Sequence, residues 1–224
     1  AFDYVNQLRQ EPSAWQPCLE IFTHIPRHAE VVRVFSLEIV NNAVQGGLLD
    51  AQSLNLVREQ LMIYLERCCG GSEGHYRPDN PSTENKLAQT FTYLFAASYE
   101  NGWQTFFDDL LALTKEKRVG SGDSLAGTIF YLRVINSVHD EIGDVLLSRS
   151  RAEQERANNL KDLVRQRDVQ KIAQSWQEIL TQWRTSNDTI AELCLKAVAK
   201  WVSWIDVSLI VNQPMLELLF QQLE

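Results

Sequence analysis

Apolar residues recur at the period of an α-helix along most of this chain. Between residues 169 and 183 they follow one another at steps of three and four, a spacing that places them on one continuous face of a helix. The residues of that face are Val169, Ile172, Ala173, Trp176, Ile179, Leu180 and Trp183. Segment 190–205 repeats the spacing, and no stretch of period two competes with it. The sequence therefore predicts an all-α fold with its tryptophans mostly in the core.

Helix-breaking and capping residues divide the chain into helices that come in pairs. Pro26 is expected to end one helix. Asp50 or Ser53 is expected to cap another, and Ser82 or Thr83 a later one. The expected helices are 2–9, 13–24, 28–45, 50–69, 83–101, 103–116, 124–142, one or two across 150–184, 188–204 and 214–224. Pair starts lie about 40 to 60 residues apart, near the period of HEAT-type hairpins with insertions. This favours a helical solenoid, with a plain helical bundle as the alternative.

The net charge of −8 limits the kinds of molecule that the surface of the protein can bind. An acidic surface repels phosphate backbones and attracts basic protein patches, so the chain alone is expected to be a poor nucleic-acid binder. No apolar run approaches the roughly 20 residues of a membrane helix. Cys18, Cys68, Cys69 and Cys194 show no metal spacing or disulfide framework, which indicates a reduced intracellular compartment.

One basic stretch departs from this acidic average. Residues 149–171 hold seven of the 21 Lys and Arg residues against four acids, a local charge of +3. Lys161 and Arg165 are four residues apart and share one face if the stretch is helical, with Lys171 in line only if a single helix continues. The stretch is either a contact for phosphate or an acidic partner, or a solvated helix with its own salt bridges.

No group of residues predicts catalysis. His24 and His28 have the spacing of a zinc pair, but Pro26 lies between them. The glycine-rich segment 70–74 lacks the strand and the lysine of a phosphate-binding loop. The acidic pairs Asp108–Asp109 and Asp140–Glu141 are expected to be solvated. We therefore expect no enzyme, metal or cofactor; a metal-dependent enzyme built on His24 and His28 is the least favoured hypothesis.

Several short segments of the chain form an ordered set, and the most specific is the stretch 202–212, which begins Val-Ser-Trp-Ile-Asp. The others are 13–18, 35–40, 85–91, 103–110, 131–134 and 175–180. This set resembles the tRNA exportins, a family of the importin-β superfamily, and the resemblance spans nearly the whole chain. It implies a HEAT-repeat solenoid of antiparallel helix pairs in a right-handed superhelical array. It also implies that 1–224 is a single N-terminal segment of about five hairpins, truncated at both ends.

The resemblance further implies a nuclear export receptor that shuttles between nucleus and cytoplasm and binds Ran-GTP together with tRNA. Nuclear pore proteins are further expected partners, and tRNA binding is expected to be weak or absent without later repeats. Helices 13–24, 50–69 and 103–116 would line the concave face. The candidate Ran contacts are Gln16, Glu20, Gln60, Tyr64, Arg67, Asp108 and Asp109. The candidate tRNA-backbone contacts are Arg156, Lys161, Arg165 and Lys171. The alternative function is a helical scaffold or adaptor that binds an unrelated protein.

Overall fold

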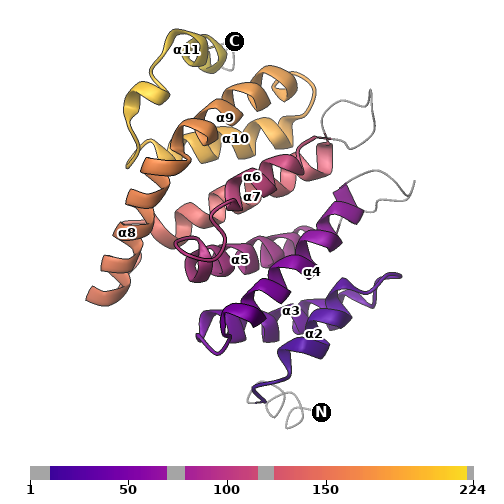
Figure 1. Ribbon diagram of the computed structural model, residues 1–224. Coiled ribbons are helices and arrows are strands. Elements are labelled where there is room, and N and C mark those ends of the chain that lie inside the picture. The colour runs from indigo at the N-terminus through magenta and orange to yellow at the C-terminus, as the bar shows by residue number, and fades with distance from the viewer. Residues whose placement is uncertain (1–10, 70–78, 116–123, 221–224) are drawn as a thin grey trace. The chain divides into compact units, whose positions relative to one another are not determined.

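The computed structural model describes residues 11–69, 79–115 and 124–220, and the elements in these ranges are ten α-helices and one 3-10 turn (Figure 1). The all-α fold class is therefore confirmed. The expected helix 2–9 and the glycine-rich segment 70–74 lie outside the described residues. The chain divides into two compact units, residues 1–106 with 116–124 and residues 107–115 with 125–224, and each is described by itself. The prediction of one continuous repeat segment stays a prediction.

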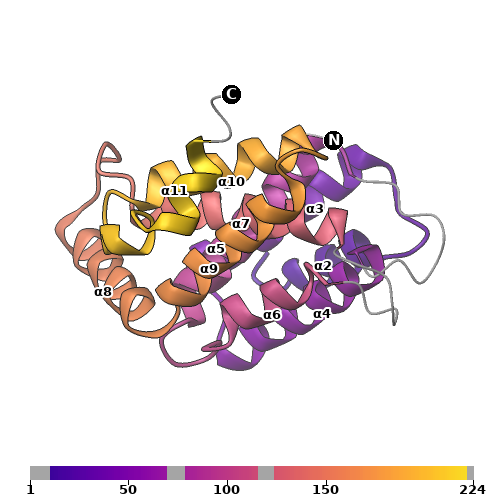
Figure 2. The same cartoon turned by 90° about the horizontal axis from the view of Figure 1, so that it is seen from above.

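The first unit contains four described helices in two layers. They are α2 (Trp15–Thr23), α3 (Glu30–Gln45), α4 (Ala51–Cys69) and α5 (Pro81–Ser98). Helix α3 packs against α2 and α5, while α4 packs against α2 and α5 from the other side. Figure 2 shows α2 and α4 in one layer and α3 and α5 in the other. This is the layering expected of HEAT-type helix pairs, and its core includes the fully buried Phe22, Leu37, Phe91 and Phe95.

The helix starts of this unit follow local capping chemistry. The Asp50 carboxylate accepts a hydrogen bond from the Ser53 N–H at 2.8 Å, which confirms the expected start of α4. The expected cap of α5 at Ser82 or Thr83 is wrong. The Asn80 side chain accepts from the Ser82 N–H at 2.8 Å, and Pro81 takes the first helical position, where no N–H is needed.

The second unit contains six described helices. They are α6 (Phe106–Ala112), α7 (Leu125–Ile142), α8 (Arg151–Arg167), α9 (Val169–Trp183), α10 (Asp188–Trp201) and α11 (Gln213–Phe220), with a 3-10 turn at Val207–Leu209 before α11. Helix α10 packs between α7 and α9, α8 contacts both α7 and α9, and α11 lies on α9. The expected helix 103–116 is shorter than predicted, because only Phe106–Ala112 is α-helical.

Tryptophans form the centre of this second core. The rings of Trp176 and Trp201 pack edge to face at 5.8 Å, and both side chains are fully buried. The Trp201 indole N–H donates to the Ile135 carbonyl at 3.1 Å, which satisfies its buried polar atom. This confirms the expectation of core tryptophans for this pair, whereas Trp183 and Trp204 are only half-buried.

The basic stretch forms two helices, so a single helix across 150–184 is excluded. Ser150 and Glu153 make a capping box at the start of α8. The helix ends at Asp168, whose φ of −129° leaves the helical region, and α9 begins at Val169. Lys171 therefore does not continue the face of Lys161 and Arg165. None of the helices in the described ranges has the length and apolar character needed to cross a membrane.

Candidate functional site

A shallow hollow lies between α2 and α4 in the first unit. It has a volume of about 290 Å³ and is lined by Glu20, Thr23, Gln60, Ile63, Tyr64 and Arg67. Four of the seven candidate Ran contacts meet here, because residues three and four apart on one helix share a face. We name this place the α2–α4 hollow. Gln16 is exposed on α2, one turn before Glu20.

The remaining two candidate Ran contacts belong to the other unit. Asp108 and Asp109 lie in the first turn of α6, and the Asp108 carboxylate forms an ion pair with Lys171 of α9. Lys171 also contacts the buried Asp168 at 2.9 Å. Partial burial alone would lower the pKa of Lys171, but its contacts with Asp108 and Asp168 outweigh this and raise the pKa. A candidate Ran contact and a candidate tRNA contact are thus paired with each other.

A buried charged cluster that sequence reasoning missed adjoins the α2–α4 hollow through Tyr64. Arg33 is 2% exposed and donates through both terminal nitrogens to the Asp79 carboxylate, with one distance of 3.0 Å. The second nitrogen also donates to the Tyr64 hydroxyl at 2.7 Å, and that hydroxyl donates to Asp79 at 3.2 Å. Arg27 adds an ion pair with Asp79 at 3.3 Å. We name Arg27, Arg33, Tyr64 and Asp79 the buried arginine cluster.

This cluster joins α2, α3, α4 and the segment before α5. The Arg33 guanidinium lies 4.7 Å from the ring centre of Phe22 on α2. Burial raises the pKa of Tyr64, and Cys68 and Asp79 add to the increase, so the phenol keeps its proton and can donate. Tyr64 is only 2% exposed, so it supports the α2–α4 hollow from beneath. The exposed or half-exposed polar residues of the hollow are Glu20, Thr23, Gln60 and Arg67.

The basic stretch presents a second polar surface, in the second unit. Partial burial lowers the pKa of Lys161, and the positive charges of Arg165 and Arg149 lower it further. Arg149 also donates to the carbonyls of Glu141 and Asp144 at the end of α7. We name Arg149, Lys161 and Arg165 the α8 basic cluster. Arg156 is exposed but lies five residues from Lys161, about 140° around the helix, so it belongs to another face.

An aromatic ring accompanies this cluster, although no aromatic residue lies near it in sequence. The Arg165 guanidinium lies 5.5 Å from the ring centre of Trp204 and donates to the Trp204 carbonyl at 2.7 Å. Arg165 also forms an ion pair with Asp162 at 2.5 Å. These contacts hold Arg165 in one position, with its charge partly offset by a carboxylate.

The histidine pair and the cysteines offer little chemistry. The rings of His24 and His28 stack at 4.7 Å around the turn that follows α2, closer than the intervening Pro26 led us to expect. No group of three or more His, Cys, Asp and Glu residues in the described ranges could hold a metal ion. Burial raises the pKa of Cys69 to about 12, and Cys68 and Glu84 contribute to the same increase, so this thiol stays protonated at neutral pH.

Layered helix pairs with polar hollows on their surface define a helical-repeat protein. Residues 80–224 match the exportin 1-like protein family, and the chain belongs to that family. It is 60% identical to exportin-T of Aspergillus oryzae and 61% identical to exportin-T of both Aspergillus terreus and Emericella nidulans, in each case over all 224 residues. The chain spans 22% of the length of each of these relatives. The resemblance to exportins and the HEAT-type solenoid class are thereby confirmed.

Proposed function

We propose that this chain is part of a nuclear export receptor and binds the small GTPase Ran in its GTP form through the α2–α4 hollow. The observation that carries the proposal is the meeting of Glu20, Gln60 and Arg67 around one hollow, on the two helices expected to line the concave face. Membership of the exportin 1-like family supports the receptor role. Such a receptor acts by binding and needs no catalytic residue, and it would shuttle between nucleus and cytoplasm.

The buried arginine cluster supports this proposal physically. It fixes Tyr64 and the adjoining turn of α4 relative to α2 and α3, so the exposed side chains of the hollow stand on a rigid base. A rigid base reduces the entropy lost when a partner binds. The net charge of −8 suits a basic partner surface, and Arg67 provides a local site for an acidic residue of that partner.

The test is retention of Ran by the immobilised 224-residue chain, with Ran loaded with GTP or GDP at near-physiological salt. We expect retention of the GTP form alone. The variant Glu20→Lys with Arg67→Glu reverses both charges of the hollow and should weaken binding by at least about tenfold, because charge reversal costs several kcal/mol at an interface. Glu192→Lys with Lys196→Glu, at two exposed positions of α10, is the control with the same two charge reversals. Equal retention of both nucleotide forms, or of neither, would favour the adaptor hypothesis.

A second candidate function is contact with the tRNA backbone in the complete receptor. The α8 basic cluster favours it, because three cations lie close enough together that two of them lower the pKa of the third. Arg156 stands on another face and Lys171 is paired with two carboxylates, so both are weaker candidates than Lys161. Trp204 beside Arg165 supplies an aromatic surface of the kind that accompanies base stacking.

The salt dependence of tRNA binding tests this second function. In the full-length receptor, Lys161→Glu should lower the magnitude of the slope of log affinity against log salt by about 0.7 to 0.9 for each lost phosphate contact. Lys196→Glu, on an exposed position of α10, is the control of equal charge change. An unchanged slope in Lys161→Glu would identify α8 as a solvated helix.

A further inference from the structure

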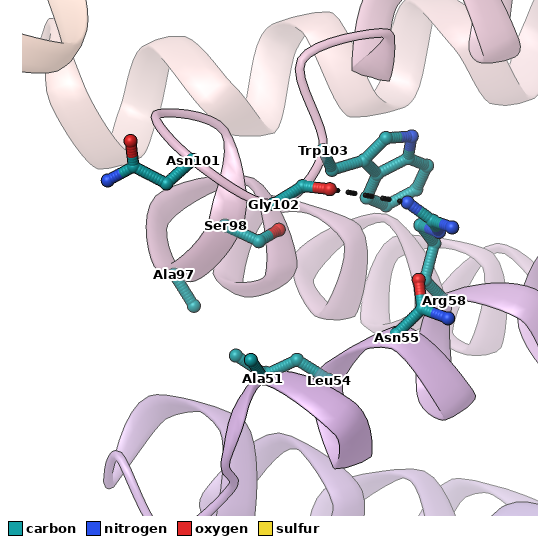
Figure 3. Close-up of a pocket in the computed structure, with 9 residues that line it drawn as sticks. All are labelled: Ala51, Leu54, Asn55, Arg58, Ala97, Ser98, Asn101, Gly102 and Trp103. Atoms are coloured by element: carbon teal, nitrogen blue, oxygen red, sulfur yellow. Dashed lines mark hydrogen bonds between the residues drawn. The ribbon is translucent and has the colours of Figure 1, made fainter.

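A second cavity lies on the opposite face of α4. It is a groove of about 200 Å³ where the first turns of α4 meet the end of α5, and we name it the α4–α5 groove. Figure 3 shows Ala51 and Leu54 of α4 facing Ala97 and Ser98 of α5 across the opening. The α4 residues of this groove and those of the α2–α4 hollow are about nine residues apart, or about 180° around the helix. A ligand in one site therefore leaves the other face of α4 free.

Arg58 closes one end of the groove and is held there by its neighbours. Its guanidinium lies 5.5 Å from the ring centre of the buried Trp103, and it approaches the Gly102 carbonyl at 3.5 Å. Its one carboxylate contact among the described residues is Glu59, at 3.8 Å. The same Glu59 oxygen also accepts a hydrogen bond from the Asn55 amide at the shorter distance of 2.7 Å. Arg58 is thus a positioned cation whose single carboxylate contact within the described part of the chain is a long one.

The turn that forms the upper wall is tightly built. The N–H groups of Gly102 and Trp103 both donate to the Ser98 carbonyl, at 2.6 and 2.7 Å. A Cβ atom on residue 102 would lie 3.2 Å from the Ser98 Cβ, so glycine allows this close approach. On the opposite wall, the Asp50 cap fixes the first turn of α4. The groove therefore exists before any ligand arrives.

The size and lining of the groove select the ligand. Its volume lies below the roughly 300–1,000 Å³ of small-molecule sites, which suits one inserted side chain better than a cofactor. Ala51, Leu54 and Ala97 offer an apolar wall, while Arg58 offers one positive charge at the end. A single cation cannot follow a phosphate backbone, which favours a peptide over a nucleic acid.

From this complementarity we infer that the α4–α5 groove binds an extended acidic peptide, with an apolar side chain between α4 and α5 and the next residue's carboxylate on Arg58. The site is independent of the Ran proposal, since its residues lie on the other face of α4. The partner is a protein segment in which a leucine-sized residue precedes aspartate or glutamate.

The test uses the isotopically labelled 224-residue chain and the peptide Gly-Ser-Leu-Asp-Ser-Gly, followed by NMR. We expect shifts of the Gly102 amide and the Trp103 indole resonances. Replacing Asp by Asn in the peptide should weaken binding by about tenfold or more, because a charged hydrogen bond is lost. Replacing Leu by Ala should also weaken it, through lost apolar contact. Equal binding of the Asp and Asn peptides, or shifts elsewhere on the chain, would overturn the inference.

Protein variants separate this site from the α2–α4 hollow. Arg58→Gln should abolish the preference for Asp over Asn, and Ala97→Leu should block the groove without changing its charge. Arg67→Gln on the opposite face is the control and should bind the peptide as the natural chain does. Arg58→Gln should still retain Ran-GTP, so failure of one proposal does not imply failure of the other. If single-stranded oligothymidine shifts the same resonances more than the peptide does, the ligand of the groove is a nucleic acid and the peptide proposal is wrong.

Discussion

The buried arginine cluster and helix α8 use charged side chains in opposite ways. Arg33 is 2% exposed, pairs with the Asp79 carboxylate together with Arg27, and donates to the Tyr64 hydroxyl. The partners of its charge are therefore distant in sequence. In α8, Arg151 and Glu155 pair one turn apart at 3.0 Å, and both are well exposed. The comparison teaches that the buried arginine cluster needs each of its partners for stability. The exposed ion pair of α8 is local, and water can replace either partner when it is lost.

The largest effect is expected from Asp79→Ala. This change leaves Arg27 and the buried Arg33 without their carboxylate, and breaking a buried pair costs about 3–5 kcal/mol. Urea denaturation of the 224-residue chain measures the loss in the free energy of unfolding. A cost below about 1 kcal/mol would mean that Arg33 finds another partner, and the contrast with α8 would fail.

A double change sharpens the same point. Arg33→Met with Asp79→Leu removes both charges and keeps apolar volume, and such replacements of buried pairs are often nearly neutral. Tyr64 loses two partners and Arg27 loses its ion pair with Asp79, so some cost remains. The double variant is expected to be more stable than Asp79→Ala in the same denaturation experiment. If it is equally unstable, the unpaired charge of the buried Arg33 is not the source of the cost.

A moderate effect is expected from Ser150→Ala, which removes the capping box of α8. Loss of a serine cap typically costs about 1 kcal/mol. Hydrogen bonds with Ser150 lower the pKa of Glu153 in the folded chain, so this stabilisation is present above the unfolded pKa and is lost as pH falls through the folded pKa. NMR titration should show Glu153 protonating at a higher pH in Ser150→Ala. An unchanged titration would place the origin of the shift elsewhere.

The smallest effect is expected from Asp162→Ala. Its ion pair with Arg165 is exposed, and such pairs contribute about 0–1 kcal/mol and weaken with salt. The free energy of unfolding should change little, and any change should shrink at high ionic strength. A loss comparable to that of Asp79→Ala would show that α8 depends on its charges as strongly as the buried cluster does.

Part of the candidate site could be predicted from sequence. The spacing of Gln60, Tyr64 and Arg67 places them on one side of a helix. The packing of α2 against α4 then brings Glu20 beside them in one hollow. The burial of the Tyr64 side chain could not be predicted from the sequence. Its hydroxyl is buried because Arg33 and Asp79 converge on it, and these residues lie 31 and 15 positions away.

Other contacts had no signal in the local sequence. Trp204 contacts Arg165 across 39 residues of the sequence. Asp108 of α6 contacts Lys171 of α9, although two helices, α7 and α8, lie between them in the sequence. The sequence analysis left open whether one or two helices cover 150–184. In the structure the buried face changes direction between Val164 of α8 and Val169 of α9, and a helix that continued through Asp168 could not bury both sets of residues on one face. Such pairings depend on which helices become neighbours in the fold. The sequence offers many other residues of the same charge for each pair, so it does not identify the partner.

The sequence by itself determined the helices, most of their ends and the apolar face that each one buries, because these depend on residues within one or two turns. Its short ordered segments also determined the family. Tertiary structure alone decided which charges are buried, which cations stay available to a partner and where α4 is hollowed on two faces. The physical reason is that burial and pairing arise between segments far apart in the chain, where packing sets the distances and the local pattern does not.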